Sequence, residues 1–373
     1  MWWGRFVAEP TRKGLVETYR KTYPTREALR LAFGECRIVV ETNSGGLKNN
    51  LADYYKGFLS QGGRADIRIT VHQAPVQDLA LSFVTKPPDP GKTKIKEAYV
   101  DLSDGRVVRK QLTAILFVFG NGDHLAVGPC LENTNQIVNF VNNRYIEWRL
   151  DRGGLLGHAA GITLGPRGLA VAGFSGMGKS TLALHLMRRG TAFVSNDRMI
   201  VENGKDGLCM HGVPKEPRIN PGTALSNPCL GGIISLEDKK RFSRLSKAEL
   251  WDLEYKYDAP IEACFGPGRF VLSGSMDGLV ILNWERGESP LIARTVVPSE
   301  RKDLLSAFRK KKGLFYLPSN GGHGDDPALE TYAAFLSKCK VIEMAGGADF
   351  EAATTMCLRF LESGEFDGKP RPR

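Results

Sequence analysis

The first part of the chain alternates short apolar strands with amphipathic helices. Residues 36–42 are rich in β-branched side chains and residues 66–72 alternate between apolar and polar, so both ranges predict strands. Residues 47–59 and 133–149 carry apolar side chains at helical spacing. These patterns predict a mixed α+β N-terminal domain over residues 1–150, for which the sequence indicates no catalytic group.

The remaining chain is richer in glycine and aliphatic residues. Apolar runs at 159–164 and 169–173 flank a Gly-Pro-Arg-Gly turn, which predicts a β-hairpin. Further strand and helix patterns continue to residue 364, so a second, α/β domain is predicted over residues 151–364. The last residues, 365–373, are short of apolar side chains and predict a disordered tail.

A glycine-rich segment lies between an apolar run at residues 169–172 and an amphipathic stretch at residues 180–189. The run predicts a buried strand, and the stretch predicts a helix. The apolar face of this helix is expected to carry Leu182, Ala183, Leu186 and Met187. The segment between them matches the phosphate-loop pattern of Gly, four residues, then Gly-Lys-Ser. The predicted nucleotide-binding residues are Gly173, Phe174, Ser175, Gly176, Met177, Gly178, Lys179, Ser180 and Thr181.

The order of strand, glycine-rich loop and helix suits a polyphosphate. Such a turn aims backbone N–H groups and the positive end of the helix dipole at one point. Lys179 is expected to reach the β- and γ-phosphates, and the Ser180 hydroxyl is expected to bind Mg²⁺. The alternative, a glycine-rich turn that carries Lys-Ser by chance, leaves the flanking strand and helix unexplained.

The predicted hairpin brings a histidine toward this loop. If the turn spans residues 165–168, His158 lies opposite Ser175, beside the expected γ-phosphate. A histidine there can act in proton transfer. The same register also fits a buried histidine with a structural hydrogen bond.

A candidate acid follows the loop helix. Residues 191–197 predict a strand with Asp197 at its carboxyl end, which is the edge where ligands of open α/β sheets bind. Asp197 is therefore expected to bind Mg²⁺ or to accept a proton from an attacking hydroxyl. An aspartate that only terminates a strand in a turn is the alternative. Asn196 can orient a ligand but is not a base.

Two further basic segments bear on the site. Residues 211–222 form a proline-rich loop in which Lys215 and Arg218 are placed to meet a transferring phosphate, although a surface loop explains them nearly as well. Residues 300–312 predict a basic helix that ends in Arg-Lys-Lys-Lys. This run is interpreted as a solvated face, with a surface for an acidic partner as the less favoured alternative.

Composition narrows the class of protein. The chain has 373 residues, a net charge of +10 and 42% hydrophobic residues, which fits two globular domains and an acidic ligand such as ATP. Basic and aromatic residues are not interleaved densely, so nucleic acid is not favoured as a partner. The seven cysteines lack paired spacing, and no signal-peptide or membrane-spanning pattern is present. We therefore expect a cytoplasmic protein without a membrane partner.

The ordered motifs resemble the HPr kinase/phosphorylase family, and within it the HPr-kinase-related kinase B proteins. The resemblance rests on His158-Ala-Ala-Gly-Ile, the phosphate loop and Val-Ser-Asn-Asp197, with Pro-Lys-Glu-Pro-Arg218 and Phe-Gly-Pro-Gly-Arg-Phe270 typical of the subgroup. It implies a P-loop kinase domain of the HPr-kinase/PEP-carboxykinase-like type that uses ATP and Mg²⁺. It also implies that Asp197 is the catalytic acid-base with His158 beside it, and that the protein is a homo-oligomer.

The resemblance has two departures. The family has two adjacent aspartates where this chain has Asn196-Asp197, and the segment associated with phosphorolysis is not found. Phosphoenolpyruvate carboxykinases share the loop pattern but are much longer, so decarboxylation is the weaker interpretation.

The sequence thus predicts a kinase that transfers the γ-phosphoryl of Mg-ATP to a hydroxyl, a serine of a partner protein by resemblance. Lys179, Asp197, His158 and Arg218 are the predicted catalytic residues, and Ser180 and Asp197 the predicted metal ligands. Phosphorylation of a small-molecule hydroxyl, or a nucleotide-dependent switch without transfer, remain as alternatives.

Overall fold

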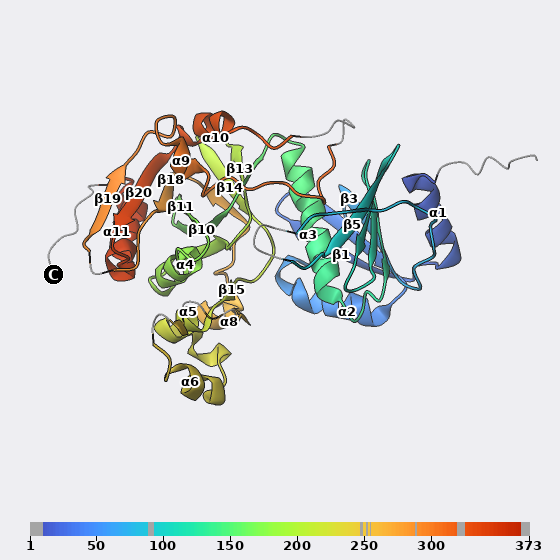
Figure 1. Cartoon of the computed structure of the whole chain (residues 1–373), viewed down its shortest axis with the longest axis horizontal. Coiled ribbons are helices and arrows are strands. Elements are labelled where there is room, and N and C mark those ends of the chain that lie inside the picture. The colour runs from blue at the N-terminus through green and yellow to red at the C-terminus, as the bar shows by residue number, and fades with distance from the viewer. Residues whose placement is uncertain are drawn as a thin grey trace, which may run out of the picture. The chain divides into compact units, whose positions relative to one another are not determined.

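The chain forms a mixed α/β structure with several sheets (Figure 1). The computed structural model describes residues 10–88, 93–246, 249–250, 253, 255–287, 289–318 and 325–366. Residue contacts divide the chain into two compact units. The first unit is Met1–Asp151 with Lys312–Asp325, and the second is Arg152–Lys311 with Asp326–Arg373. Within the predicted tail, residues 367–373 lie outside the described residues.

The first unit is built on an eight-stranded sheet in the order β1-β2-β3-β8-β7-β6-β5-β4. Its strands are β1 (Glu27–Phe33), β2 (Cys36–Thr42), β3 (Ile67–Gln73), β4 (Val84–Thr85), β5 (Glu97–Leu102), β6 (Gly105–Lys110), β7 (Leu116–Phe119) and β8 (Asp123–Gly128). The β2–β3 and β3–β8 pairs are parallel, and the other pairs are antiparallel. The strands expected near residues 36–42 and 66–72 are therefore neighbours in this sheet.

Helices cover both faces of this sheet (Figure 1). They are α1 (Arg12–Thr22), α2 (Gly45–Tyr54), the 3₁₀ helix Lys56–Phe58 and α3 (Thr134–Leu150). Side chains of β7 alternate between the faces, as its period of two requires. Leu116 and Val118 pack in one cluster with Val16 of α1, whereas the ring of Phe117 lies 4.5 Å from that of Phe140 in α3.

A segment from the C-terminal half of the sequence completes the first unit. The ring of Phe315 stacks on Phe119 at 5.6 Å and contacts Phe117 edge-on at 5.5 Å. The backbone of this segment is held as well, because Arg144 donates to the Phe315 carbonyl and Leu317 N donates to the carboxylate of Glu147 at 3.0 Å. The linear division into 1–150 and 151–364 does not include this return of the chain.

The described residues of the second unit form three sheets. A six-stranded sheet has the order β12-β10-β11-β18-β20-β19, a four-stranded sheet has the order β17-β14-β13-β9, and β15 pairs with β16. The strands are β9 (Leu155–Gly157), β10 (Ala159–Leu164), β11 (Arg167–Gly173), β12 (Ala192–Ser195), β13 (Met199–Asn203), β14 (Leu208–Gly212), β15 (Arg218–Ile219), β16 (Tyr257–Asp258), β17 (Ser273–Ser275), β18 (Gly278–Leu282), β19 (Leu291–Thr295) and β20 (Lys340–Gly346). In the six-stranded sheet β11, β18 and β20 are parallel neighbours.

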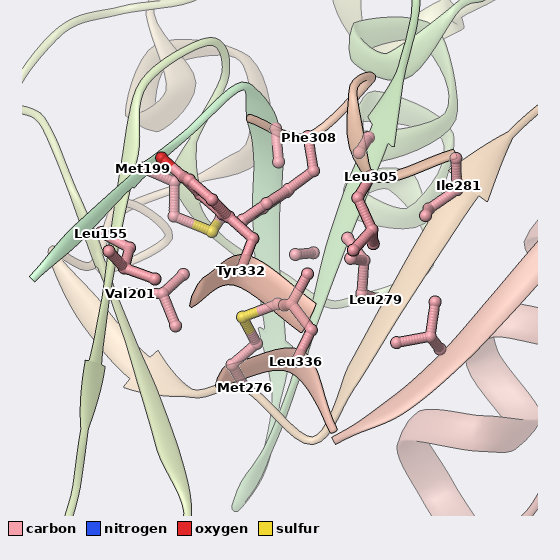
Figure 2. Close-up of a cluster of buried hydrophobic side chains, with 14 of the residues drawn as sticks. Leu155, Met199, Val201, Met276, Leu279, Ile281, Leu305, Phe308, Tyr332 and Leu336 are labelled. Carbon is pink, nitrogen blue, oxygen red and sulfur yellow. The ribbon is translucent and has the colours of Figure 1, made fainter. Parts of the chain in front are cut away.

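Two cores hold the six-stranded sheet. On one face, Leu169 and Val171 of β11 pack with α4 (Lys179–Arg188) and α11 (Phe350–Ser363). On the other face, Ala170 and Ala172 join a cluster shared with the four-stranded sheet, α9 (Lys302–Leu305) and α10 (Leu329–Leu336). Figure 2 shows this second cluster, with Phe308 and Tyr332 among its side chains. The small alanines let the two sheets approach on this face.

A smaller group of helices extends from the second unit beside α4 (Figure 1). It comprises α5 (Pro221–Ser226), the 3₁₀ helix Pro228–Ile233, α6 (Leu236–Phe242) and α8 (Ile261–Phe265). Leu184 and Met187 of α4 share a buried cluster with Ile219, Leu230 and others from this group. The loop helix is thus packed on two sides.

The structure corrects two predicted elements. The hairpin turn has two residues, not four, because Leu164 pairs with Arg167 and Ala159 pairs with Ala172. Gly165 supplies the positive φ of 57° that a tight turn needs. The predicted basic helix over 300–312 is also wrong: only Lys302–Leu305 is helical, and the chain beyond it runs along β9.

No helix of the described residues combines the length and the apolar content needed to cross a bilayer.

Candidate active site

The glycine-rich loop joins the end of β11 to the start of α4, as the apolar run and the helical spacing predict. Gly178 adopts a left-handed conformation, with φ 87°, and caps α4. A Cβ at this position would lie 2.5 Å from the ring of Phe350. Trp284 Nε1 donates to the Met177 carbonyl at 3.0 Å, so side chains from outside the loop fix its backbone. The sequence analysis identified neither aromatic residue as part of the site.

Lys179, the first residue of α4, folds back over the loop. Its ammonium donates to the carbonyls of Gly173 at 2.8 Å and Phe174 at 3.3 Å. Burial lowers the pKa of Lys179 to about 8, the charge of Asp197 opposes this shift, and that of Lys310 adds to it. These three charged side chains therefore lie close enough to influence one another.

The other predicted loop residues surround this lysine. Phe174, Ser175 and Gly176 are exposed, and Ser180 is half-buried in the first turn of α4. The Thr181 hydroxyl lies 2.8 Å from that of Thr223 in α5, which ties the loop helix to the helical extension. A ligand can therefore reach the loop from solvent at Phe174, Ser175 and Gly176.

His158 and Asp197 meet as the sequence analysis expected, although through a different register. His158 lies between β9 and β10, and extension of the observed pairing sets it across from Gly173 rather than Ser175. Asp197 lies in the tight connection from β12 to β13, which a hydrogen bond from Ser195 Oγ to the Arg198 carbonyl closes. His158 Nε2 is 3.0 Å from Asp197 Oδ1.

Asp197 is held in its ionised form. Burial of the carboxyl opposes ionisation, but the His158 hydrogen bond and the charges of Lys310 and Arg198 outweigh it, so the pKa of Asp197 falls below its usual value. About half of the side chain, 55%, remains exposed. The carboxylate can therefore accept a hydrogen bond from a ligand without displacing His158.

Lys310 is a member of the site that the sequence analysis did not identify. Its ammonium lies 3.3 Å from Asp197 Oδ2 and 3.4 Å from Oδ1. The run that contains it was interpreted as a solvated face, which is wrong for Lys310 because its side chain is only 24% exposed. Pairing with β9, a contact between residues far apart in sequence, places it there.

The predicted cation Arg218 lies in β15 and forms an ion pair with Asp258 of β16 at 3.5 Å. Its side chain is 60% exposed. Its charge and that of Asp197 both act on Lys215, whose pKa is lowered chiefly by burial. Lys215 is therefore within electrostatic reach of the Asp197 carboxylate, and the role of Arg218 stays a prediction.

The donors expected for Mg²⁺ are oxygen atoms, which this ion prefers. The amide oxygen of Asn196 is buried and accepts no hydrogen bond from the described residues. It is adjacent in sequence to the Asp197 carboxylate, so the residues present fit a hard cation. Over the described ranges no group of three or more His, Cys, Asp and Glu side chains is arranged to hold a metal. A cation here would take further oxygen ligands from a bound phosphate.

The chain was compared with known proteins. No family model and no curated protein match it. Among solved structures, it is similar to the Hpr(Ser) kinase/phosphatase from Coxiella burnetii, with a TM-score of 0.29 and 13% sequence identity. The match covers 56% of this chain and 93% of the other.

Proposed function

We propose that this protein is a kinase that transfers the γ-phosphoryl group of ATP to a hydroxyl. The observation that carries the proposal is the group formed by Lys179 at the start of α4 and the paired His158 and Asp197. A helix N-terminus with a lysine binds phosphates, and an ionised carboxylate beside it can hold an acceptor hydroxyl. The sequence resemblance supports a serine of a partner protein as the acceptor.

The reaction forms a bond from the acceptor oxygen to the γ-phosphorus and breaks the bond from that phosphorus to the β,γ-bridging oxygen, which leaves with ADP. Asp197 orients the hydroxyl and receives its proton. Because the transition state of phosphoryl transfer is loose, positioning and charge neutralisation supply most of the rate enhancement. The lowered basicity of Asp197 is compatible with this role.

The other side chains hold this arrangement. His158 fixes one oxygen of Asp197, and Lys179 balances the charge on the phosphates. Mg²⁺, held by the Ser180 hydroxyl and the oxygens of Asn196 and Asp197, would neutralise charge on the phosphates when bound. An exposed loop surface leaves room for a hydroxyl carried on a large partner.

Two substitutions separate nucleotide binding from transfer. Lys179→Ala removes the cation nearest the loop, so ATP affinity should fall at least about tenfold. Asp197→Asn keeps the shape of the side chain but not its charge, so ATP should still bind while transfer falls about 10²-fold or more. Calorimetry with Mg-ATP measures the first effect. Transfer of label from γ-labelled ATP into a cell extract measures the second.

Lys311→Ala is the control, because Lys311 is exposed and carries the same charge. Full phosphoryl transfer by the Asp197→Asn variant would show that this carboxylate does not receive the proton of the hydroxyl. If a small molecule is labelled instead of a protein, the protein is still a kinase, but its acceptor is a small-molecule hydroxyl. Nucleotide-dependent complex formation without any labelled product would favour a switch protein.

A further inference from the structure

The backbone of Lys310 is fixed beside the site. Phe308 accepts a hydrogen bond from His158 N at 2.6 Å, and Lys310 N donates to the Leu156 carbonyl at 3.2 Å. Gly157 and Arg309 form the bridge between these two bonds. The chain at 308–310 therefore runs antiparallel to β9 through one isolated bridge, and the same pairing that places His158 also places Lys310.

Both lysines of the site have partners that a polyanion can replace. Lys179 is bonded to two carbonyls of its own loop, and Lys310 to one partly exposed carboxylate. An ion pair of that exposure contributes little stability, since water competes for both charges. A terminal phosphate has more charge and more acceptor oxygens than Asp197 and forms stronger hydrogen bonds with ammonium groups.

The carboxylate of Asp197 has two partners in the ligand-free protein. His158 occupies Oδ1 at 3.0 Å, and Lys310 spans both oxygens. An acceptor hydroxyl needs one of these oxygens. Lys310 covers both oxygens of the carboxylate, so its transfer to another anion would leave Asp197 more open to the hydroxyl.

We propose that Lys310 is a second phosphate-binding lysine, which leaves Asp197 and binds the terminal phosphate when a nucleoside triphosphate occupies the loop. This inference rests on the proposed function. The exchange links the two substrates: binding of the triphosphate frees the carboxylate that receives the acceptor. A nucleoside diphosphate lacks the γ-phosphate, so it leaves Lys310 on Asp197.

The test compares ATP with ADP. Dissociation constants of both nucleotides are measured by calorimetry with Mg²⁺ for the full chain, Lys310→Met, Lys310→Arg and Lys311→Met. Lys310→Met should bind ATP about tenfold or more weakly than the unchanged protein and ADP within about twofold of it. Lys310→Arg keeps the cation and should keep most of the preference for ATP. Lys311→Met makes the same change in charge at an exposed neighbour and should alter neither constant.

The outcomes are distinct. If the unchanged protein binds ATP and Lys310→Met keeps the same ratio of ATP to ADP affinity, that result overturns the role of Lys310 but not the proposed kinase function. An equal loss for both nucleotides also overturns it, because that result indicates a general structural or electrostatic effect. If the unchanged protein binds neither nucleotide, the proposed function fails, and the role of Lys310 falls with it.

Discussion

His72 in β3 is a buried histidine whose ring makes no hydrogen bond with the described residues. Its side chain is 0% exposed, and neither ring nitrogen has a partner among the described residues. The ring stacks with that of Tyr19, with the centroids 6.3 Å apart, and the tilted ring of Tyr23 lies at 6.2 Å. Burial, and to a smaller extent the charge of Arg20, lowers the pKa of His72 to about 4. His72 is therefore part of the packed interior of the first unit, where its neutral form is favoured.

The first unit should therefore lose stability in mild acid. The unfolded chain binds a proton near pH 6.5 at His72, whereas the folded chain does so only near pH 4. Protonation favours unfolding across that interval, at about 1.4 kcal/mol per pH unit and about 3 kcal/mol in all. In histidine-labelled protein, the NMR signal of His72 should titrate near pH 4. His72→Phe assigns the signal and should reduce the slope of stability against pH, and a midpoint near 6.5 would contradict the prediction.

Single residues of the candidate site were predictable where a sequence motif, or a position directly after a predicted strand, indicates the chemistry of the side chain. Lys179 follows from a motif, and Asp197 from its position after the next strand. Lys310 was not predictable in this way, because a run of basic residues is usually solvated and its contact with Asp197 depends on pairing with β9. No local signal in the sequence distinguishes Lys310 from Lys311, which is exposed.

Among the elements, the loop helix was predicted well and the hairpin register was not. The helical spacing identified Leu182, Ala183, Leu186 and Met187, all of which are buried. The hairpin differed because Gly165 allows a turn of two residues, and a change of two residues in the turn shifts every cross-strand partner. Register depends on turn geometry that composition alone does not determine.

The lack of a side chain at Gly157 lets the chain at 308–310, which carries Lys310, pack close to β9. A Cβ added at this position would overlap the ring of Phe308, which lies in the neighbouring chain at 308–310. Gly157→Ala should therefore push that chain away from β9 and lower the free energy of unfolding by about 1–3 kcal/mol. The midpoint of chemical denaturation measures this loss. The preference for ATP over ADP should fall in the same variant, since Lys310 moves with that segment.

A second substitution tests the cause. Phe308→Leu makes room for the added methyl group, so the double variant should lose less stability than the two single variants together. Gly232→Ala is the matched control, because a Cβ there meets nothing within 4 Å. Simple additivity in the double variant would show that the clash with Phe308 is not the reason.

At the scale of the whole molecule, the division of the chain is not linear. The first unit takes back the segment Lys312–Asp325 after the chain has passed through most of the second unit. Hydrophobic patterning located the change near residue 150 because composition shifts there. It did not identify the returning segment, since a short stretch with Phe315 and Tyr316 resembles any loop in sequence. The aromatic cluster between the sheet and α3, together with the hydrogen bonds of Arg144 and Glu147, shows where that stretch packs.

Phe315 is the anchor of this returning segment. Its ring contacts three phenylalanines of the first unit, and Lys110 Nζ lies 4.9 Å from its centroid. Phe315→Ala should destabilise the first unit by about 2 kcal/mol, since the side chain is partly exposed and leaves a cavity only on its buried side. Hydrogen exchange read by mass spectrometry should then show faster exchange in β7 and α3, with β11 and β18 unchanged. Leu112→Ala, a truncation at a side chain that is 63% exposed, should leave both units as they are. Equally faster hydrogen exchange in β11 and β18 would mean that the two units unfold together. That result would contradict the prediction, which assumes that each unit has its own core.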